Sequence, residues 1–308
     1  MHDKNIQHHI MIFGTMSAGK STFINALIGS ELLPVGNEAT TSVHTVIEHD
    51  DRKKLPHAIC YANASIRTAQ SQKINSEIIR KWSNDPEIEQ IHIKTRFMGT
   101  RGTTRNCTLH DTPGPNNSQA SLHSERAFQA LNNISCDTLC YLLNATQIGI
   151  QDDQHLLKKI QKILADRPKT RIIFILNKID CLNPEQGEDI TGFLQQTKHY
   201  LEQNGFHDPL VIPVMGYLAL TAKKQLRGEP LSFKERLFLR FNIEHPPEPI
   251  NNDSELFYSR KKNKKYIFHA NLNKFQPLTN LKNEISILKK LLAISGITIV
   301  EEIFHHHY

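Results

Sequence analysis

The sequence lacks any long apolar run, and its N-terminus carries no apolar segment. No stretch approaches the roughly 18 consecutive apolar residues that a membrane-spanning helix needs. Residues 1–7 are polar and lack the hydrophobic core of a secretory signal peptide. There is also no internal repeat or low-complexity tract. We therefore expect a globular protein of the cytoplasm, since 39% hydrophobic residues are enough to form a substantial core.

The cysteines lack the spacing of a metal site or a disulfide framework. They are five in number, which is odd, and no two of them form a C-x-x-C pair. We expect them to be reduced and mostly buried, as free thiols are in a reducing compartment. They are Cys60, Cys107, Cys136, Cys140 and Cys181.

The net charge is moderate and does not select one kind of partner. The formal charge of +6 favours an anionic partner, and a nucleotide alone would satisfy it. One dense basic run, residues 260–265, could bind acidic lipid or nucleic acid, but such runs are more often solvated loops. The three histidines at 305–307 have no partners of fixed geometry, so we do not expect a functional metal site there.

What the chain does contain is a repeated alternation of short apolar runs with helical patterns. This alternation predicts an α/β fold of the P-loop NTPase class, a mostly parallel sheet with helices on both faces. We expect strands at residues 8–13, 42–48, 57–62, 90–97, 108–110, 138–143, 171–176 and 210–214. We expect helices at residues 21–28, 72–82, 153–165 and 189–203. Beyond residue 216 the pattern is helical and irregular, with helices at 231–241 and 281–293, and an apolar stripe over 281–304 that should be core.

A phosphate-binding loop is predicted between the first strand and the first helix. The segment fits G-x-x-x-x-G-K-[ST] in the strand-loop-helix context that this motif requires. Its glycines let backbone N–H groups face the phosphates, its lysine neutralises the β and γ oxygens, and its serine hydroxyl ligates magnesium. The expected nucleotide-binding residues are Gly14, Thr15, Met16, Ser17, Ala18, Gly19, Lys20, Ser21 and Thr22.

A second motif follows the apolar run that ends at residue 110. Asp111-Thr112-Pro113-Gly114 places a carboxylate at a strand tip, where it can hold magnesium through water. The N–H of Gly114 can reach the γ-phosphate. A plain surface turn is the alternative interpretation, and the phosphate loop upstream makes it the weaker one.

A third motif predicts guanine as the base. Asn177-Lys178-Ile179-Asp180 follows an apolar strand, at the edge of the sheet where nucleotides bind. Asp180 can accept hydrogen bonds from N1–H and the N2 amine of guanine, whereas adenine would leave it unpaired. Asn177 can reach N7 and connect neighbouring loops, and the Lys178 stem can cover the base. Together the motifs predict GTP and GDP as ligands.

These residues resemble the dynamin family, especially its bacterial members. The resemblance rests on residues 14–29, 32–36 and Thr40-Thr41, and it extends over most of the chain. Within the family, residues 14–34 and 111–116 are similar to the enterobacterial clamp-binding branch. The resemblance implies one dynamin-type G domain over residues 1–308, with a core at 6–222 and a closing segment at 223–308. The sequence departs from the family because it shows neither an upstream clamp-binding peptide nor a long helical stalk.

The resemblance also implies roles for further residues. Ser17 would help to orient the attacking water and a monovalent cation, K⁺ or Na⁺, and Thr41 would ligate magnesium and position the same water. Met16 stands where many dynamins have glutamine, so the water network departs from theirs. The loop at residues 214–216 also departs from the usual Ser-Ala, although a backbone N–H there, assigned to Met215, could still contact the guanine oxygen.

Catalysis is expected to require a dimer. Pro115 occupies the position at which Ras-like enzymes carry a water-orienting glutamine, and proline has no side-chain amide. The catalytic set would then be Lys20, Ser17, Thr41 and the Gly114 N–H, completed when two G domains meet.

Two other functions stay open from the sequence. The domain could be a GTP-dependent switch with little turnover, which Met16 would favour, or a ribosome-associated GTPase of the Era type, against which the long segment 47–108 counts. Family resemblance suggests a place at the membrane or at the nucleoid. Association with a membrane or a DNA clamp has no support in the sequence itself. The sequence leaves open whether the chain acts with a stalk-bearing partner chain and whether it is a fragment of a longer protein.

Overall fold

The fold is taken from a computed structural model of the chain. It describes residues 7–15, 17–36, 43–53, 55–62, 65–69, 74–99, 107–112, 128, 131–132, 134–183, 187–247 and 281–305. Several expectations therefore lie outside the described residues: those on Met16, Thr41, Gly114 and Pro115, and the basic run 260–265.

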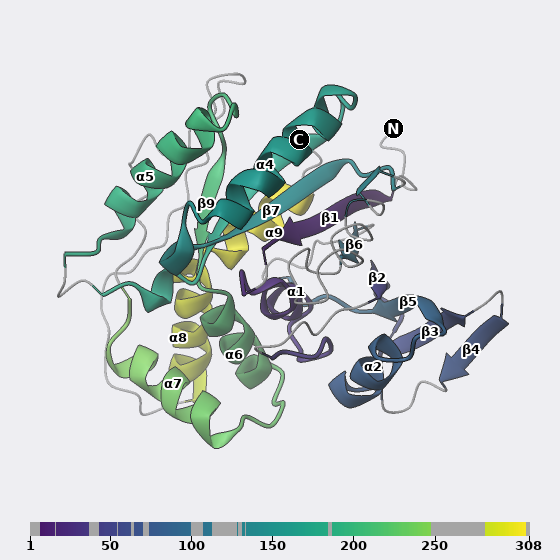
Figure 1. The fold of residues 1–308 in the computed structure, drawn as a ribbon. Helices are drawn as coiled ribbons and strands as arrows, with labels where there is room; N and C mark the ends of the chain where they lie inside the picture. The colour runs from purple at the N-terminus through teal and green to yellow at the C-terminus, as the bar shows by residue number, and fades with distance from the viewer. Residues whose placement is uncertain are drawn as a thin grey trace, which may run out of the picture.

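One mixed sheet forms the centre of the described structure, with strand order β4-β3-β5-β2-β6-β1-β7-β8-β9 (Figure 1). The pairs β6-β1, β1-β7, β7-β8, β8-β9 and β5-β2 are parallel, whereas β2-β6, β3-β4 and β3-β5 are antiparallel. The strands are β1 (His8–Gly14), β2 (His44–His49), β3 (His57–Ala62), β4 (Ser65–Ala69), β5 (Ile88–Thr95), β6 (Cys107–Asp111), β7 (Thr138–Asn144), β8 (Arg171–Asn177) and β9 (Val211–Val214).

The burial of the central strands accounts for their continuous apolar runs in the sequence. Every residue of β7 is buried, and so are the last five residues of both β1 and β8, which is the pattern of parallel strands covered on both faces. From Gln90 onward, half-buried and buried residues alternate in β5, which is the pattern of a strand buried mainly on one face.

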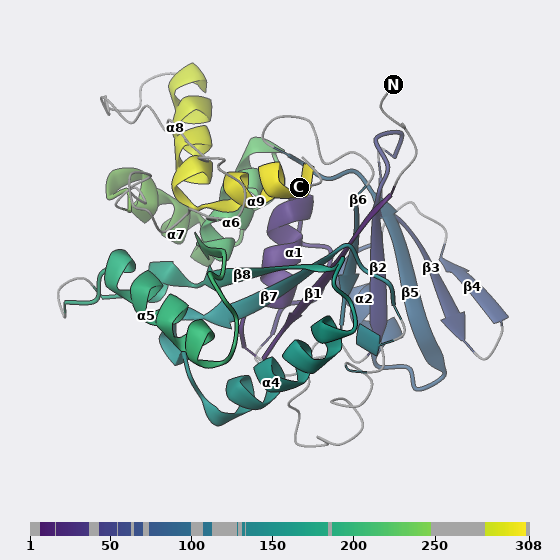
Figure 2. The same ribbon diagram turned by 90° about the horizontal axis from the view of Figure 1, so that it is seen from above.

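Helices cover both faces of the sheet, as the alternation predicted. In Figure 2, α4 and α5 lie on one side of the central strands, and α1, α6 and α9 lie on the other. The helices are α1 (Lys20–Ile28), α2 (Ser76–Ser83), α4 (Gln151–Ala165), α5 (Ile190–Gln203), α6 (Gly216–Leu226), α7 (Phe233–Glu244), α8 (Leu281–Ile294) and α9 (Ile297–His305). Two short 3₁₀ turns, η2 (Ala145–Gln147) and η3 (Ile179–Cys181), follow β7 and β8.

Several element bounds differ from the sequence prediction, and one strand was not expected. Strand β4 was not expected, and it pairs antiparallel with β3 at the edge of the sheet. The helix predicted from residue 72 begins at Ser76, because the side chain of Asn75 accepts a hydrogen bond from the Ile78 N–H at 3.1 Å and caps it.

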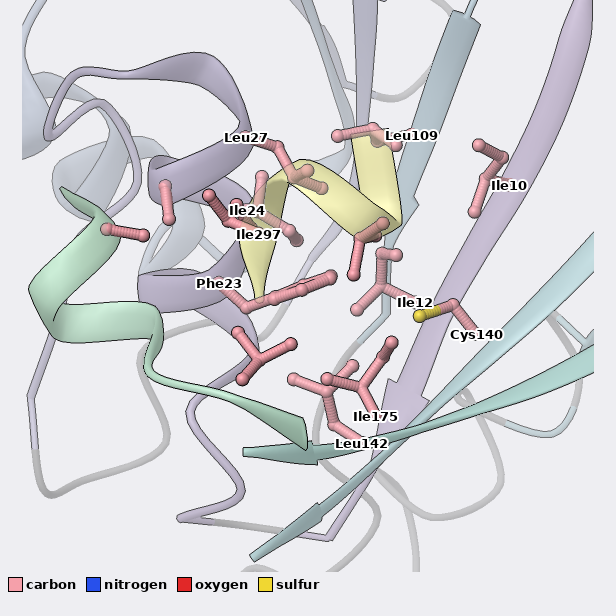
Figure 3. Packing of buried hydrophobic residues seen from close by; sticks show 14 of the residues in the cluster. Ile10, Ile12, Phe23, Ile24, Leu27, Leu109, Cys140, Leu142, Ile175 and Ile297 are labelled. Carbon is pink, nitrogen blue, oxygen red and sulfur yellow. The ribbon is translucent and has the colours of Figure 1, made fainter. Parts of the chain in front are cut away.

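The C-terminal helices belong to the core, which confirms the prediction for the stripe at 281–304. Ile297 and Val300 of α9 are fully buried, and Figure 3 shows Ile297 in the same hydrophobic cluster as Ile24 of α1 and Leu109 of β6. Helix α8 packs against α6. Four of the five cysteines are also buried, and Cys181 is exposed. Among the described helices, none has the length and apolar content that crossing a bilayer requires.

Candidate nucleotide-binding site

The phosphate loop joins β1 to α1, and its two glycines are held in conformations that suit no other residue. Gly14 has a φ of 151°, and a Cβ atom there would lie 2.5 Å from the carbonyl oxygen of Leu142. Gly19 has a φ of 85°, and a Cβ atom there would lie 2.6 Å from Nδ2 of Asn177. Both the backbone conformation and the available space therefore require glycine at these positions.

Lys20 folds back over the loop that precedes it. Its Nζ donates hydrogen bonds to the carbonyl oxygens of Gly14 and Thr15, each at 3.0 Å. Burial lowers the pKa of Lys20, and the negative charge of Asp111 acts in the opposite direction. The lysine is therefore placed over the loop, within the electrostatic reach of the carboxylate that ends β6.

Asp111 is fully buried at the tip of β6, beside Ile12 of β1 in the parallel register. The next residue fixes the chain there, since the Thr112 hydroxyl donates to the carbonyl oxygen of Ile12 at 3.0 Å. Ser21 and Thr22 lie half-buried in the first turn of α1, directly after the loop.

The residues present fit a magnesium ion. Mg²⁺ prefers oxygen ligands and is usually held by one or two protein oxygens together with substrate phosphates and water. A buried carboxylate, Asp111, and a hydroxyl, Ser21, are the oxygen donors expected beside the phosphate loop. Thr41, the third expected ligand, lies outside the described residues, as does Gly114.

The base motif lies directly against the phosphate loop through Asn177, the last residue of β8. This side chain is buried, and its Nδ2 donates to the carbonyl oxygen of Ala18 at 2.9 Å. Its Oδ1 accepts from the Gly216 N–H at 3.1 Å. One amide thus connects three loops, those that follow β1, β8 and β9.

Lys178 and Asp180 lie in the turn that directly follows β8. Lys178 adopts the left-handed conformation, with φ 65° and ψ 31°, and starts the 3₁₀ turn η3. Asp180 is half-buried in this turn. Burial raises the pKa of the Asp180 carboxyl, and the charge of Lys178 acts against this rise.

Met215 departs from its expected role. It is buried, and its N–H donates to the carbonyl oxygen of Ser295, in the turn between α8 and α9, at 2.9 Å. The neighbouring Gly216 N–H is engaged by Asn177. In this structure Met215 therefore has no free N–H for a guanine oxygen, because the C-terminal helices occupy that donor.

Sequence reasoning missed Asn144 at the tip of β7. It stands in register with Asn177, and its Nδ2 approaches the carbonyl oxygen of Ser17 at 3.4 Å and Oε1 of Gln147 at 3.2 Å. Its Oδ1 accepts from the Thr146 N–H at 3.1 Å, which caps η2. Ser17 itself is exposed, with a φ of 64°. The only sequence signal for Asn144 is a polar residue that directly follows an apolar strand.

The chain is similar to known proteins of one family. The profile of the dynamin family matches residues 10–179. A bacterial dynamin-like protein from Nostoc punctiforme is 27% identical over 221 residues, which is 65% of this chain and 29% of that protein. The clamp-binding protein CrfC of Escherichia coli is 49% identical over 47 residues, 15% of this chain and 6% of that protein.

Among solved structures, an oligomerised bacterial dynamin pair, described as sensing and tethering membranes, aligns with a TM-score of 0.53 and 21% identity. The alignment covers 77% of this chain and 38% of that one. The chain thus spans well under half the length of these relatives. Because the family profile covers more than half of the 308 residues, and the motifs within it meet at one edge of the sheet, the chain belongs to the dynamin family of GTPases.

Proposed function

We propose that this chain binds GTP with magnesium and hydrolyses it to GDP and phosphate at the site between the phosphate loop, Asp111 and residues 177–180. The observation that carries the proposal is the contact of Asn177 with Ala18, at 2.9 Å. It brings the base motif against the phosphate loop, although 159 positions separate these two residues in the sequence. Phosphate and base groups of one nucleotide can therefore be bound together.

Each side chain has a role that follows from its position. Lys20 would exchange its loop carbonyl partners for the β and γ oxygens of GTP, which are stronger acceptors because they are charged. The N-terminus of α1 adds unpaired N–H groups and a positive dipole end. Ser21 and Asp111 would hold magnesium, which neutralises charge on the phosphates when bound.

Guanine is the base that suits Asp180. An ionised carboxylate only accepts hydrogen bonds, and guanine offers two adjacent donors, N1–H and the N2 amine. Adenine has no such pair, and it would leave the half-buried carboxylate without a partner, at a cost of about 1–3 kcal/mol.

We further propose that turnover depends on two G domains meeting across the nucleotide face. Pro115 cannot orient water, so Ser17, Thr41, the Gly114 N–H and a K⁺ or Na⁺ ion would do so together, as the resemblance to dynamins implies. The exposed position of Ser17 supports this role. The similar bacterial dynamin is an oligomerised pair, which also favours assembly.

The C-terminal part of the chain, residues 223–308, would belong to the same domain, because α9 packs on α1.

The test measures phosphate release from GTP by the purified chain over a range of protein concentrations, with Lys20→Ala as the control for contaminating activity. Specific activity should rise with concentration, and GDP with aluminium fluoride should produce a dimer in ultracentrifugation. The Lys20→Ala variant should release no phosphate above background. A rate per chain that does not depend on concentration, with a monomer in aluminium fluoride, would contradict the dimer mechanism and favour a switch. Equal turnover by Lys20→Ala would refute the site.

A further inference from the structure

Helix α7 presents an apolar stripe on its outer face. Phe233 is 69% exposed, Leu237 is 52% exposed and Phe241 is 61% exposed. These include the two most exposed of the large hydrophobic side chains in the described part of the chain, and all three lie on one helix. Because they are four residues apart, they lie within about 80° of one another around the helix.

The inner face of α7 holds the helix firmly, so the stripe is not a product of loose packing. Leu239 is buried, and the ring of Phe238 lies 4.8 Å from that of Tyr217 on α6. Glu235 pairs with Lys224 of α6. Ser232 and Glu235 form a reciprocal capping box at the N-terminus. The exposed residues are therefore presented on a fixed scaffold at the edge of the molecule, where α7 lies in Figure 1.

Positive charges flank the stripe on both sides. Around the helix, Arg236 and Arg240 follow one border of the stripe and Lys234 follows the other, and all three are exposed. Glu244 is the one exposed carboxylate of this helix. It lies on the same side as the stripe, one turn beyond Phe241 at the C-terminal end, and Arg240 Nε pairs with its Oε1 at 2.8 Å. Apolar side chains bordered by basic ones are typical of a helix that lies in the interface of a bilayer. The apolar side of such a helix lies at the boundary of the acyl chains, and its cations lie among the headgroups.

We propose that the outer face of α7 docks onto an anionic lipid surface. Each basic residue near such a surface contributes attraction, and the aromatic side chains add buried apolar area. A second copy of the chain fits less well, because a self-complementary contact would bring the same cationic borders together. The inference is independent of the proposed GTP hydrolysis, since α7 contributes no residue to the nucleotide site.

The experiment is sedimentation of the whole chain, without nucleotide, with vesicles of phosphatidylcholine alone or mixed with phosphatidylglycerol. Leu237→Glu places a negative charge in the centre of the stripe. Leu55→Glu is the matched control, because Leu55 is 54% exposed but lies in the loop before β3. Thermal unfolding of both variants checks that they fold, and ultracentrifugation without vesicles reports self-association.

We expect the wild-type chain to sediment with the phosphatidylglycerol vesicles, to stay in solution with phosphatidylcholine alone, and to be released by salt. Leu237→Glu should weaken binding about tenfold or more, and Leu55→Glu should leave it unchanged. Wild-type protein that stays in solution with both vesicles would overturn the proposal, as would equal binding by Leu237→Glu. A dimer in solution that Leu237→Glu dissociates, without vesicle binding, would assign the stripe to an interface between copies and overturn it as well.

Discussion

At the scale of the residue, the geometry of the phosphate loop depends on how closely its backbone approaches neighbouring side chains. The hydrogen bond from Asn177 to Ala18 brings the asparagine amide close to the Cα of Gly19. The amide of Asn177 therefore occupies the space that a side chain at residue 19 would need. The same amide also accepts from Gly216, so a displacement here would affect the loop after β9.

Gly19→Ala should disrupt the site for this reason. The new methyl would meet Asn177 Nδ2 at 2.6 Å in a backbone conformation that costs an L residue about 1–2 kcal/mol. We expect GDP affinity, measured by titration of a fluorescent analogue, to fall at least about tenfold. Gly228→Ala is the control, because Gly228 has a φ of 69° with nothing within 4 Å of its Cβ position. It should cost stability and leave affinity intact; equal affinities for both variants would contradict the packing argument.

The sequence predicts the motif residues because phosphate and guanine chemistry demand fixed residue types at fixed spacing. The sequence does not reveal that Asn144 contacts Ser17, or that the Met215 N–H donates to Ser295. Both hydrogen bonds depend on which loops meet in the folded chain. Ser295 is 80 positions away in the sequence, and nothing in the loop after β9 shows that the C-terminal helices reach it.

At the scale of the element, a buried ion pair connects α9 to the C-terminal end of α1. Lys223 of α6 is fully buried, donates to the carbonyl oxygen of Ala26 at 2.6 Å, and pairs with Glu301 of α9. Burial lowers the pKa of Lys223, and the carboxylate of Glu301 opposes that shift. The last turn of α1 also favours a cation, because helix C-termini carry partial negative charge.

Glu301→Ala should destabilise the fold strongly. It would leave the buried Lys223 without its carboxylate, and breaking a buried pair in this way typically costs about 3–5 kcal/mol. Urea unfolding should show the loss, whereas Glu244→Ala, which removes the exposed partner of Arg240, should give no measurable change. Equal unfolding curves for the two variants would show that α9 does not depend on this pair.

A row of one amide and three imidazole side chains crosses neighbouring strands of the sheet. Gln90 of β5 contacts His44 of β2 at 3.2 Å, His44 contacts His110 of β6 at 3.2 Å, and His110 contacts His9 of β1 at 3.0 Å. A neutral imidazole donates at one nitrogen and accepts at the other, so the contacts can form one continuous hydrogen-bonded row. Burial lowers the pKa of His44 to about 4 and that of His110 to about 3.

This row should make the fold sensitive to acid. The pKa of His44 falls from about 6.5 to about 4 on folding. The contribution of this neutral imidazole to the free energy of unfolding is therefore complete above pH 6.5 and is lost as the pH falls toward 4. The free energy of unfolding should decrease over this window by up to about 1.4 kcal/mol per pH unit for this histidine. His44→Gln should reduce the slope, and the exposed His207→Gln should not. Identical slopes for all three proteins would contradict the assignment.

A helix or strand could be predicted from the sequence where its burial leaves a clear pattern of apolar residues. Strands β7 and β8 are continuous apolar runs because helices cover both of their faces. Strand β4 was missed because it is an edge strand of five residues, SIRTA, without a continuous apolar run. The antiparallel pairing of β2 with β6 also has no local signal, since strand direction depends on tertiary contacts.

At the scale of the whole molecule, we propose that segments far apart in the sequence form one guanine-nucleotide site. The phosphate loop, Asp111 and residues 177–180 come from the ends of β1, β6 and β8, which lie close together in the sheet. In this proposal Asp180 selects the base, so exchanging one of its acceptors for a donor tests whether the site binds guanine.

The most direct measurement is a competition titration of fluorescent GDP against GTP, XTP and ATP, with the wild-type chain and Asp180→Asn. In the variant, the side-chain amide of residue 180 would face a donor group of guanine with its own N–H donor, which costs about 1–3 kcal/mol. Xanthine instead presents a carbonyl that can accept a hydrogen bond from this amide. We predict that the wild type prefers GTP to ATP by at least about tenfold. The preference of Asp180→Asn should move to XTP without loss of the fold. A wild type that does not distinguish GTP from ATP, or a variant that keeps its guanine preference, would contradict the proposed site.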